Sequence, residues 1–271
     1  RSKIAIGDGL GNVSLDPEDY VVLPSWWEDS YGVPGLPFGN IVQVAGGSDS
    51  GKTSIAIIAM KAAQEQGIGI IYVETEGKTT TSDLEAWGVD PSRVVIIKQA
   101  VTEKAWDDAQ LAIDSFFDVY PEEELLFIYD SYGNTVSLRD KDIDMVTESQ
   151  KPGGAAKTNR IGINKLVVKM EEFRIAPLII NYTYANIGSV GQTNAGGRGL
   201  DFFSKITIQT NRKAWVEKQV KGQKVRAGAT ASWKTYKNHF AKGLKDDEGN
   251  TRYFPKDIIV RITEKGMERL A

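Results

Sequence analysis

An eight-residue loop, Gly46-Gly47-Ser48-Asp49-Ser50-Gly51-Lys52-Thr53, restricts the possible folds of this chain more than any other feature. It follows the apolar run 41–45 and precedes the helical pattern 54–60. A strand, a Gly-x-x-x-x-Gly-Lys-Thr loop and a helix in this order make up the P-loop, whose backbone N–H groups and helix dipole favour bound phosphate. The sequence therefore predicts a nucleoside triphosphate site formed by residues Gly46 through Ser54.

Side chains of the right chemistry complete the expected phosphate site. Lys52 would reach the outer phosphates, and the Thr53 hydroxyl would bind Mg²⁺. Asp130 ends an apolar strand, where proteins of this kind place a carboxylate that coordinates the same metal ion. Glu76 follows the next strand after the P-loop helix, and a carboxylate there can orient the water that attacks the terminal phosphate. Because side chains alternate along a strand, we expect Glu74 to share a face with Glu76 and to support it.

Composition excludes several other kinds of site. The chain has no cysteine and one histidine, His239, which excludes disulfides, cysteine-ligated metals and a histidine-based zinc centre. No apolar run approaches the length of a transmembrane helix, and residues 1–4 do not resemble a signal peptide. We therefore expect a cytoplasmic protein without membrane contact.

The net charge of −3 hides an uneven distribution of charge. Between Asn211 and Lys245 the chain has ten lysines and arginines against one acid, Glu217, so the remainder is acidic. This asymmetry is compatible with a surface for a polyanion and equally with a solvated basic hairpin. Charge alone does not decide between the two.

Apolar periodicity predicts that strands and helices alternate within one α/β domain. This order indicates a P-loop NTPase core: a mostly parallel twisted sheet flanked by helices, with an antiparallel extension at the C-terminal end. We assign residues 1–40 to an N-terminal strand and wrap, and residues 41–271 to the core. The expected strands are 41–45, 68–73, 94–98, 125–130, 176–182, 205–210, 231–236 and 257–263, and the expected helices after the P-loop helix are 82–87, 103–120 and 159–173.

Two long polar stretches, 139–157 and 185–199, leave strands at the carboxyl edge of the expected sheet, which is the ligand side of such a fold. Loops of this length inside a compact domain are usually functional or disordered. They contain no aromatic residues, so stacking of bases on them is not expected. Their backbone amides, with Lys157, Arg160 and Arg198, could contact phosphates instead.

Taken together, these motifs resemble the RecA family of DNA recombinases over most of the chain. The catalytic glutamate of that family falls on Glu76. The matching segments are 36–53 for the entry into the P-loop, 72–76 for the glutamate strand, Gly88-Val89-Asp90 after it, Asp130-Ser131 for the metal-binding strand, Asn181 before the second DNA-binding loop, and Gly196-Gly197 with Leu200 at the exit of that loop.

The resemblance implies a function, cofactors and partners. Members of the family form a helical filament on single-stranded DNA, hold ATP and Mg²⁺ between neighbouring protomers, and pair the strand with homologous duplex DNA. The resemblance makes 139–157 and 185–199 the two DNA-binding loops, and it makes residues 4–6 a strand added to the neighbouring subunit. It assigns DNA contacts to Lys157, Arg160, Asn186, Gly196, Gly197 and Arg198, and contacts to the neighbour's ATP to Lys237 and His239.

Three positions depart from the bacterial pattern of the family. Tyr182 occupies the nucleotide-sensing position, where bacterial members have glutamine, and 181–184 is closer to the phage-type, UvsX-like members. Asp83 aligns with the tyrosine that stacks on adenine, which leaves the base contact unassigned. His239 replaces a lysine, and its charge near neutral pH depends on its surroundings. A phage-encoded chain would be located in the host cytoplasm.

Two alternative functions share the same core. A hexameric replicative helicase motor would form closed rings, and an ATP-binding regulator that does not bind DNA would use the two loops for protein contacts. The sequence favours a DNA-dependent ATPase that promotes strand exchange.

Overall fold

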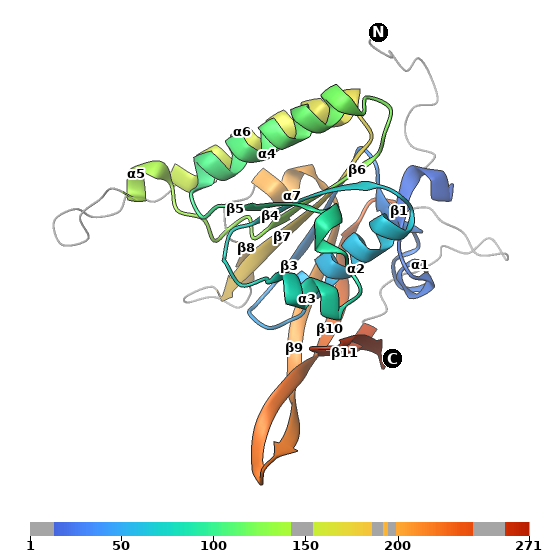
Figure 1. Cartoon of the computed structure of the whole chain (residues 1–271), viewed down its shortest axis with the longest axis vertical. Helices are drawn as coiled ribbons and strands as arrows, with labels where there is room; N and C mark the ends of the chain where they lie inside the picture. The colour runs from blue at the N-terminus through green and yellow to red at the C-terminus, as the bar shows by residue number, and fades with distance from the viewer. Residues whose placement is uncertain (1–13, 142–153, 186–191, 195–198, 241–257, 271) are drawn as a thin grey trace.

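The computed structural model describes residues 14–141, 154–185, 192–194, 199–240 and 258–270. Helices and strands alternate along these residues as the apolar pattern predicts (Figure 1). The strands are β1 (Tyr20–Val22), β2 (Gly35–Pro37), β3 (Ile41–Gly46), β4 (Gly69–Glu74), β5 (Val95–Lys98), β6 (Leu125–Asp130), β7 (Ile175–Ala185), β8 (Gln192–Asn194), β9 (Ser204–Val220), β10 (Gln223–Asn238), β11 (Ile258–Thr263) and β12 (Gly266–Arg269). The helices are α1 (Ser25–Tyr31), α2 (Lys52–Glu65), α3 (Thr81–Ala86), α4 (Thr102–Val119), α5 (Leu138–Lys141), α6 (Gly154–Glu172) and α7 (Gly199–Phe203), with short 3₁₀ helices at Pro17–Asp19 and Pro91–Arg93.

One large sheet organises the described residues, with the strand order β12-β11-β10-β9-β3-β7-β6-β4-β5. Each neighbouring pair from β9 to β5 in this order is parallel. The strands β10, β11 and β12 are antiparallel to their neighbours, and β8 pairs antiparallel with the end of β7. The predicted fold, a mostly parallel sheet with an antiparallel extension, is confirmed.

Apolar side chains cover both faces of this sheet, which explains why its central strands are continuous apolar runs. On one face, Ile55 of α2 lies in a buried cluster with Val44 of β3. On the other face, Ile113 of α4 and Ile163 of α6 share a cluster with Phe127 of β6. Figure 1 shows α4 and α6 side by side along that face. The two layers hold the carboxyl ends of the parallel strands together at one edge.

The segment before β3 is more regular than the turn-rich wrap that we expected. It contains β1, α1 and β2, and its side chains Trp27, Tyr31 and Leu36 are fully buried in the same cluster as α2. The predicted strand 4–6 lies outside the described residues, and the assignment of residues 1–40 to a protomer contact stays a prediction. No helix in the described ranges is both long enough and apolar enough to span a membrane.

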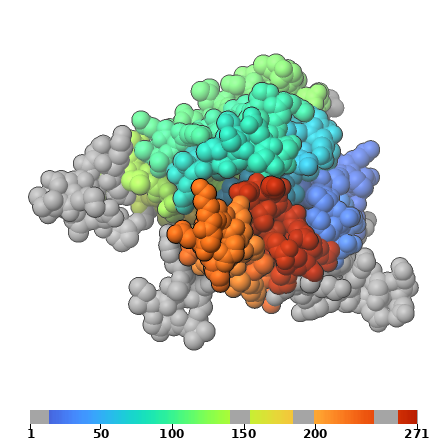
Figure 2. Space-filling model, turned by 60° about the horizontal axis from the view of Figure 1, so that its bottom comes forward, coloured from blue at the N-terminus to red at the C-terminus, as the bar shows by residue number. Residues whose placement is uncertain are grey.

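The hairpin β9–β10 is much longer than the two short strands that we predicted. The strands meet at Lys221 and Gly222, both with positive φ (50° and 81°), as a two-residue hairpin turn requires. Most of the basic segment 211–245 therefore belongs to this hairpin, and the hairpin projects from the body of the molecule (Figure 1). Figure 2 shows it beside β11 and β12. Its outer residues are largely exposed, so no apolar alternation marks them as strand in the sequence.

Some residues that we predicted to lie in the two polar loops belong to helices or strands. Helix α5 occupies 138–141, and α6 begins at Gly154, five residues before the predicted start at 159. Strand β7 continues to Ala185 and pairs with β8. The first turn of α6 contains no large apolar residue, which is why the periodic signal begins later in the sequence. Residues 142–153, 186–191 and 195–198 lie outside the described residues.

Candidate nucleotide-binding site

The P-loop lies at the carboxyl end of β3, as predicted, and the structure explains two of its glycines. A Cβ on Gly46 would lie 2.1 Å from Thr210 Oγ1 and 2.3 Å from the Thr210 carbonyl oxygen. Gly51 has a φ of +87°, and a Cβ there would lie 2.3 Å from Cδ1 of Ile262. Glycine is required at Gly46 because β9 approaches too closely for a side chain, and at Gly51 because the backbone is left-handed.

Hydrogen bonds from the neighbouring strands hold the P-loop in place. The Ser50 hydroxyl donates to the Gly47 carbonyl oxygen (2.8 Å) and lies 2.6 Å from the Thr210 hydroxyl. The indole Nε1 of Trp233, a buried residue of β10, donates to the Ser50 carbonyl oxygen at 3.0 Å. The antiparallel extension therefore supports the loop directly.

Lys52 lies inside the loop with its charge retained. Its Nζ donates to the Gly47 carbonyl oxygen at 2.6 Å and lies 4.1 Å from the ring centroid of Tyr182. Burial lowers the pKa of Lys52 to about 8, and the nearby carboxylates of Asp130 and Glu76 limit that decrease. At neutral pH the side chain remains mainly a cation, which suits it to a phosphate group.

Thr53 and Asp130 meet as the metal prediction requires. The Thr53 hydroxyl donates to Oδ2 of Asp130 at 2.7 Å, and Asp130 is buried. Burial raises the pKa of Asp130 to about 6, with the Thr53 hydrogen bond acting in the opposite direction. Within the described ranges, no group of three or more Asp, Glu or His side chains forms a complete metal site. These two oxygen donors therefore fit Mg²⁺ that takes its other ligands from phosphates and water.

Glu76 faces the same pocket and is held by three donors. Its Oε1 accepts from the Ser131 hydroxyl (2.8 Å), and its Oε2 accepts from the Tyr182 hydroxyl (3.2 Å). Lys78 Nζ lies 2.5 Å from the same Oε2. Burial alone would raise the pKa of Glu76, but the hydrogen bonds from Lys78, Ser131 and Tyr182 hold it below its usual value. Burial, with the nearby Glu76 carboxylate, raises the pKa of Tyr182 to about 12, so its hydroxyl keeps its proton and donates.

The expectation that Glu74 shares the pocket face with Glu76 is wrong. Strand β4 ends at Glu74, and the chain then turns through Gly77, whose φ is +68°. The buried carboxylate of Glu74 accepts the backbone N–H groups of Glu76 (3.0 Å), Gly77 (2.8 Å) and Lys78 (3.3 Å). Its support is therefore indirect, because it fixes the turn that carries Glu76.

The pocket around these groups has a volume of about 320 Å³ and both polar and apolar walls. The P-loop lines it together with the polar side chains of Glu76, Lys78, Asp130 and Tyr182, and Trp215, Ala229 and Ile262 add apolar surface. Trp215 could not be selected from the sequence, because it belongs to the part of β9 that lacks an apolar period. Asp83 does not line the pocket: its carboxylate forms a capping box with Thr80 at the start of α3.

The structure describes two of the predicted DNA contacts. Lys157 and Arg160 are exposed on α6. A Cβ on Gly199, at the start of α7, would lie 3.6 Å from Cγ of Arg160, so the exits of both predicted loops lie next to each other. The other predicted contacts, Asn186, Gly196, Gly197 and Arg198, lie outside the described residues.

Lys237 and His239 do not join the P-loop of their own chain. Lys237 pairs with Thr207 of β9, and Thr207 is opposite Gln43 near the amino end of β3, whereas the P-loop follows the carboxyl end. Lys237 Nζ donates to the Asp201 carbonyl oxygen at 2.8 Å. Any contact with ATP would have to be made with a neighbouring chain.

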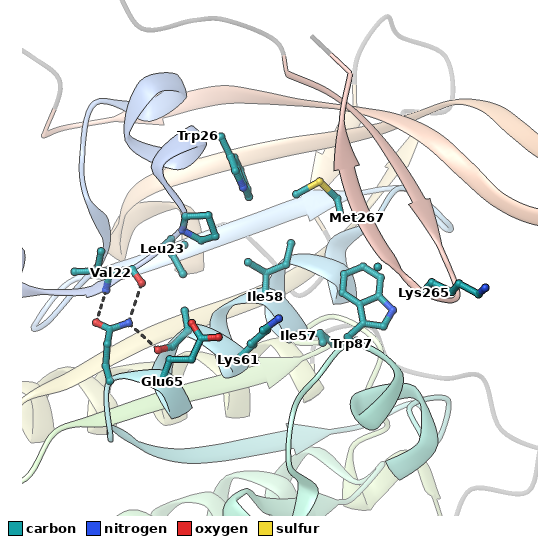
Figure 3. Close-up of a pocket in the computed structure, with 14 residues that line it drawn as sticks. Val22, Leu23, Trp26, Ile57, Ile58, Lys61, Glu65, Trp87, Lys265 and Met267 are labelled. Carbon is teal, nitrogen blue, oxygen red and sulfur yellow. Dashed lines mark hydrogen bonds between the residues drawn. The ribbon is translucent and has the colours of Figure 1, made fainter.

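A larger cavity, of about 700 Å³, lies between α1, α2 and the β11–β12 hairpin (Figure 3). Its walls are mainly apolar, with Trp26, Ile58, Trp87 and Met267 among them. None of the described residues that line it belongs to the P-loop or to the predicted site. Its size therefore does not make it the nucleotide site.

The fold and the P-loop pocket define a P-loop NTPase with a mostly parallel core. The chain belongs to the RecA family, because the model of the RecA N-terminal domain matches residues 25–255. The predicted RecA-type core is thereby confirmed.

Curated relatives agree with this assignment. The chain is 28% identical over 226 residues to "Protein RecA" of Clostridioides difficile (strain 630), which covers 82% of this chain and 61% of the relative. It is 26% identical over 193 residues to "Protein RecA" of Malacoplasma penetrans, which covers 70% of this chain and 56% of the relative. The chain thus spans about half to three-fifths of the length of the curated relatives it matches.

Proposed function

We propose that this chain is a DNA-dependent ATPase that forms a helical filament on single-stranded DNA and promotes pairing and strand exchange with homologous duplex DNA. The observation that carries the proposal is the assembly of Lys52, Thr53, Asp130 and Glu76 in one pocket of a RecA-family chain. The sequence of 181–184, which is closer to the phage-type, UvsX-like members than to the bacterial ones, supports that subtype. A cytoplasmic location, in the host if a phage encodes the chain, belongs to the same proposal.

The site fits ATP with Mg²⁺. Bound ATP would supply the phosphoryl group, and Mg²⁺ would offset its charge. The P-loop from Gly46 to Ser54 would hold the phosphates with Lys52, and the oxygens of Thr53 and Asp130 would hold the metal ion. Glu76 is ionised and fixed by Ser131 and Tyr182, so it can accept a proton from water and orient that water.

The surface positions of other residues support contacts with DNA and with a second protomer. Lys157 and Arg160 lie on one exposed stretch of α6 beside α7, where two cations can contact a phosphate backbone. Lys237 and His239 lie toward the opposite end of the sheet from the P-loop, so a protomer stacked on another could present them to its neighbour's ATP. Such cations would stabilise negative charge in the transition state.

ATP hydrolysis with and without single-stranded DNA tests the proposal. We expect DNA to stimulate hydrolysis by the wild-type chain. Glu76→Gln should lower the stimulated rate by about 100-fold or more, because a positioned base contributes at least that much. It should leave binding of a non-hydrolysable ATP analogue largely intact.

Glu65→Gln provides the matched control, because Glu65 is exposed and lies outside the nucleotide pocket. It should hydrolyse ATP at the wild-type rate. Absence of any DNA stimulation in the wild-type chain would contradict the proposal. Closed rings in place of filaments in electron micrographs would favour the helicase motor, and unchanged activity of Lys157→Ala with Arg198→Ala would favour the regulator.

A further inference from the structure

The turn that follows β4 places two opposite charges at the nucleotide pocket. The Glu74 carboxylate accepts three consecutive backbone N–H groups of this turn, and Gly77 supplies its left-handed conformation. Because the backbone is fixed in this way, the side chains of Glu76 and Lys78 both reach the pocket. The turn therefore presents a base and a cation together.

Lys78 differs from Glu76 in how freely it can change partner. The Lys78 side chain is 72% exposed, whereas the Glu76 side chain is 9% exposed. Among the described residues, Glu76 is the acid that forms an ion pair with Lys78. Glu76 keeps its bonds to Ser131 and Tyr182 if the ammonium group moves. The ammonium group can therefore turn toward a ligand without leaving a buried acid unpaired.

The charges around the pocket show why such a cation is needed. Among the described residues that line it, the cations are Lys52 and Lys78, and the acids are Asp49, Glu76 and Asp130. Arg212, from β9, pairs with Asp49 at 3.2 Å. Lys52 would reach the outer phosphates from the P-loop, but within the described part of the chain it donates to the Gly47 carbonyl oxygen and forms no ion pair with Glu76. A terminal phosphate beside the ionised Glu76 would meet like charge, which opposes binding unless a cation lies between them.

We propose that Lys78 is a specificity-determining residue that contacts the terminal phosphate of a nucleoside triphosphate within the same chain. This inference rests on the proposed function, because it assumes that the P-loop binds ATP. The Lys78 ammonium bridges the Glu76 carboxylate and that phosphate, and thereby offsets their repulsion. A diphosphate lacks the group that Lys78 contacts. The pocket therefore distinguishes ATP from ADP through a side chain on its own turn.

Binding measurements with Lys78→Ala test this inference directly. The ligands are a non-hydrolysable ATP analogue and ADP, each with Mg²⁺, titrated calorimetrically into the full chain. Loss of a charge-assisted contact should weaken binding of the ATP analogue by about tenfold and should change ADP affinity less than about twofold. Lys78→Arg, which keeps the charge, should restore most of the affinity for the analogue.

Lys98→Ala is the matched control, because Lys98 is an exposed lysine that donates to the Thr79 carbonyl oxygen beside the same turn but does not line the pocket. It should bind both ligands as the wild type does. Equal weakening of both ligands, or no weakening of either, in Lys78→Ala would overturn the inference while leaving the ATPase proposal intact. A wild-type chain that binds neither ligand would remove the proposed function itself. Lys78→Gln, which retains a long polar side chain, repeats the test if the alanine variant unfolds.

Discussion

At the scale of single residues, Trp215 has two kinds of neighbour. Its ring lines the nucleotide pocket, and the guanidinium groups of Arg212 and Arg226 lie 4.3 and 4.2 Å from its ring centroid. Arg212 also pairs with Asp49 in the P-loop. These contacts hold the indole in position at the pocket. Asp83 stands where the family has its adenine-stacking tyrosine, so the base contact must come from another residue. Tyr182, the other aromatic residue among the described residues that line the pocket, contacts Lys52 and Glu76, so we predict that Trp215 contacts the nucleobase.

Trp215→Ala should weaken binding of a non-hydrolysable ATP analogue by about tenfold, in line with the usual loss of base–aromatic contact. Inorganic tripolyphosphate has no base, so its affinity should stay the same, and competition between the two ligands would measure the difference. Tyr236→Ala is the control, because this tyrosine belongs to the same hairpin, is 76% exposed and does not line the pocket. Equal weakening of tripolyphosphate would show that Trp215 acts on the P-loop and not on the base.

At the scale of elements, α6 is positioned by an unusually close contact with α4. A Cβ on Gly162 would lie 2.1 Å from Cδ2 of Trp106. The Trp106 indole donates to Asn159 Oδ1 at 2.8 Å, and Asn159 Nδ2 donates to the Tyr132 carbonyl oxygen at 2.8 Å. The helix that carries Lys157 and Arg160 is thus fixed to the end of β6.

Gly162→Ala should lower the free energy of unfolding. Alanine is favoured in a helix by up to about 1 kcal/mol, but overpacking against a buried ring costs about 1–3 kcal/mol or more, so the clash should prevail. Urea denaturation measures the change. Val168→Ala, at a position 54% exposed on the same helix, should change stability by less than about 0.5 kcal/mol. A Gly162→Ala variant as stable as wild type would mean that α6 shifts without penalty.

The elements that could be predicted from sequence are those with a buried face. The strands β3 to β7 and the helices α2 and α4 have clear apolar patterns, and the P-loop order places Lys52 and Thr53 near Asp130. The outer part of β9–β10 and the first turn of α6 could not be predicted, because they bury too little apolar surface to show a period. Lys78 and the role of Glu74 depend on the turn after β4, and the position of Trp215 depends on the bulged hairpin β9–β10. The local apolar pattern predicts neither of these conformations.

At the scale of the whole molecule, the P-loop and the pair Lys237 and His239 lie toward opposite ends of the sheet. Within one chain, therefore, Lys237 and His239 do not lie at the P-loop. This separation is compatible with the head-to-tail assembly that we propose, in which each chain would offer these two residues to the next. In the assembly that we propose, the basic segment 211–245 would lie at one contact surface and the P-loop at the other.

The double variant Lys237→Ala with His239→Ala should bind the ATP analogue as the wild type does. Its DNA-stimulated rate of hydrolysis should fall by about 100-fold or more, because it cannot supply a neighbouring chain with the cations that stabilise the transition state. Mixing it with an excess of Lys52→Ala chains should restore part of the activity, because each variant lacks a different half of the shared site. Rates of the mixture would be measured against the sum of the two separate variants. No recovery on mixing, with both variants folded, would contradict a shared site.

The hydrogen bond from the Trp233 indole to the Ser50 carbonyl oxygen has a mechanical consequence. Trp233 belongs to the same strand as the outer arm of the hairpin, so we expect the conformation of the P-loop and the position of that arm to influence each other. A partner that contacts the arm would then act on the P-loop through β10, over a path that includes the two register shifts between Trp233 and Arg226.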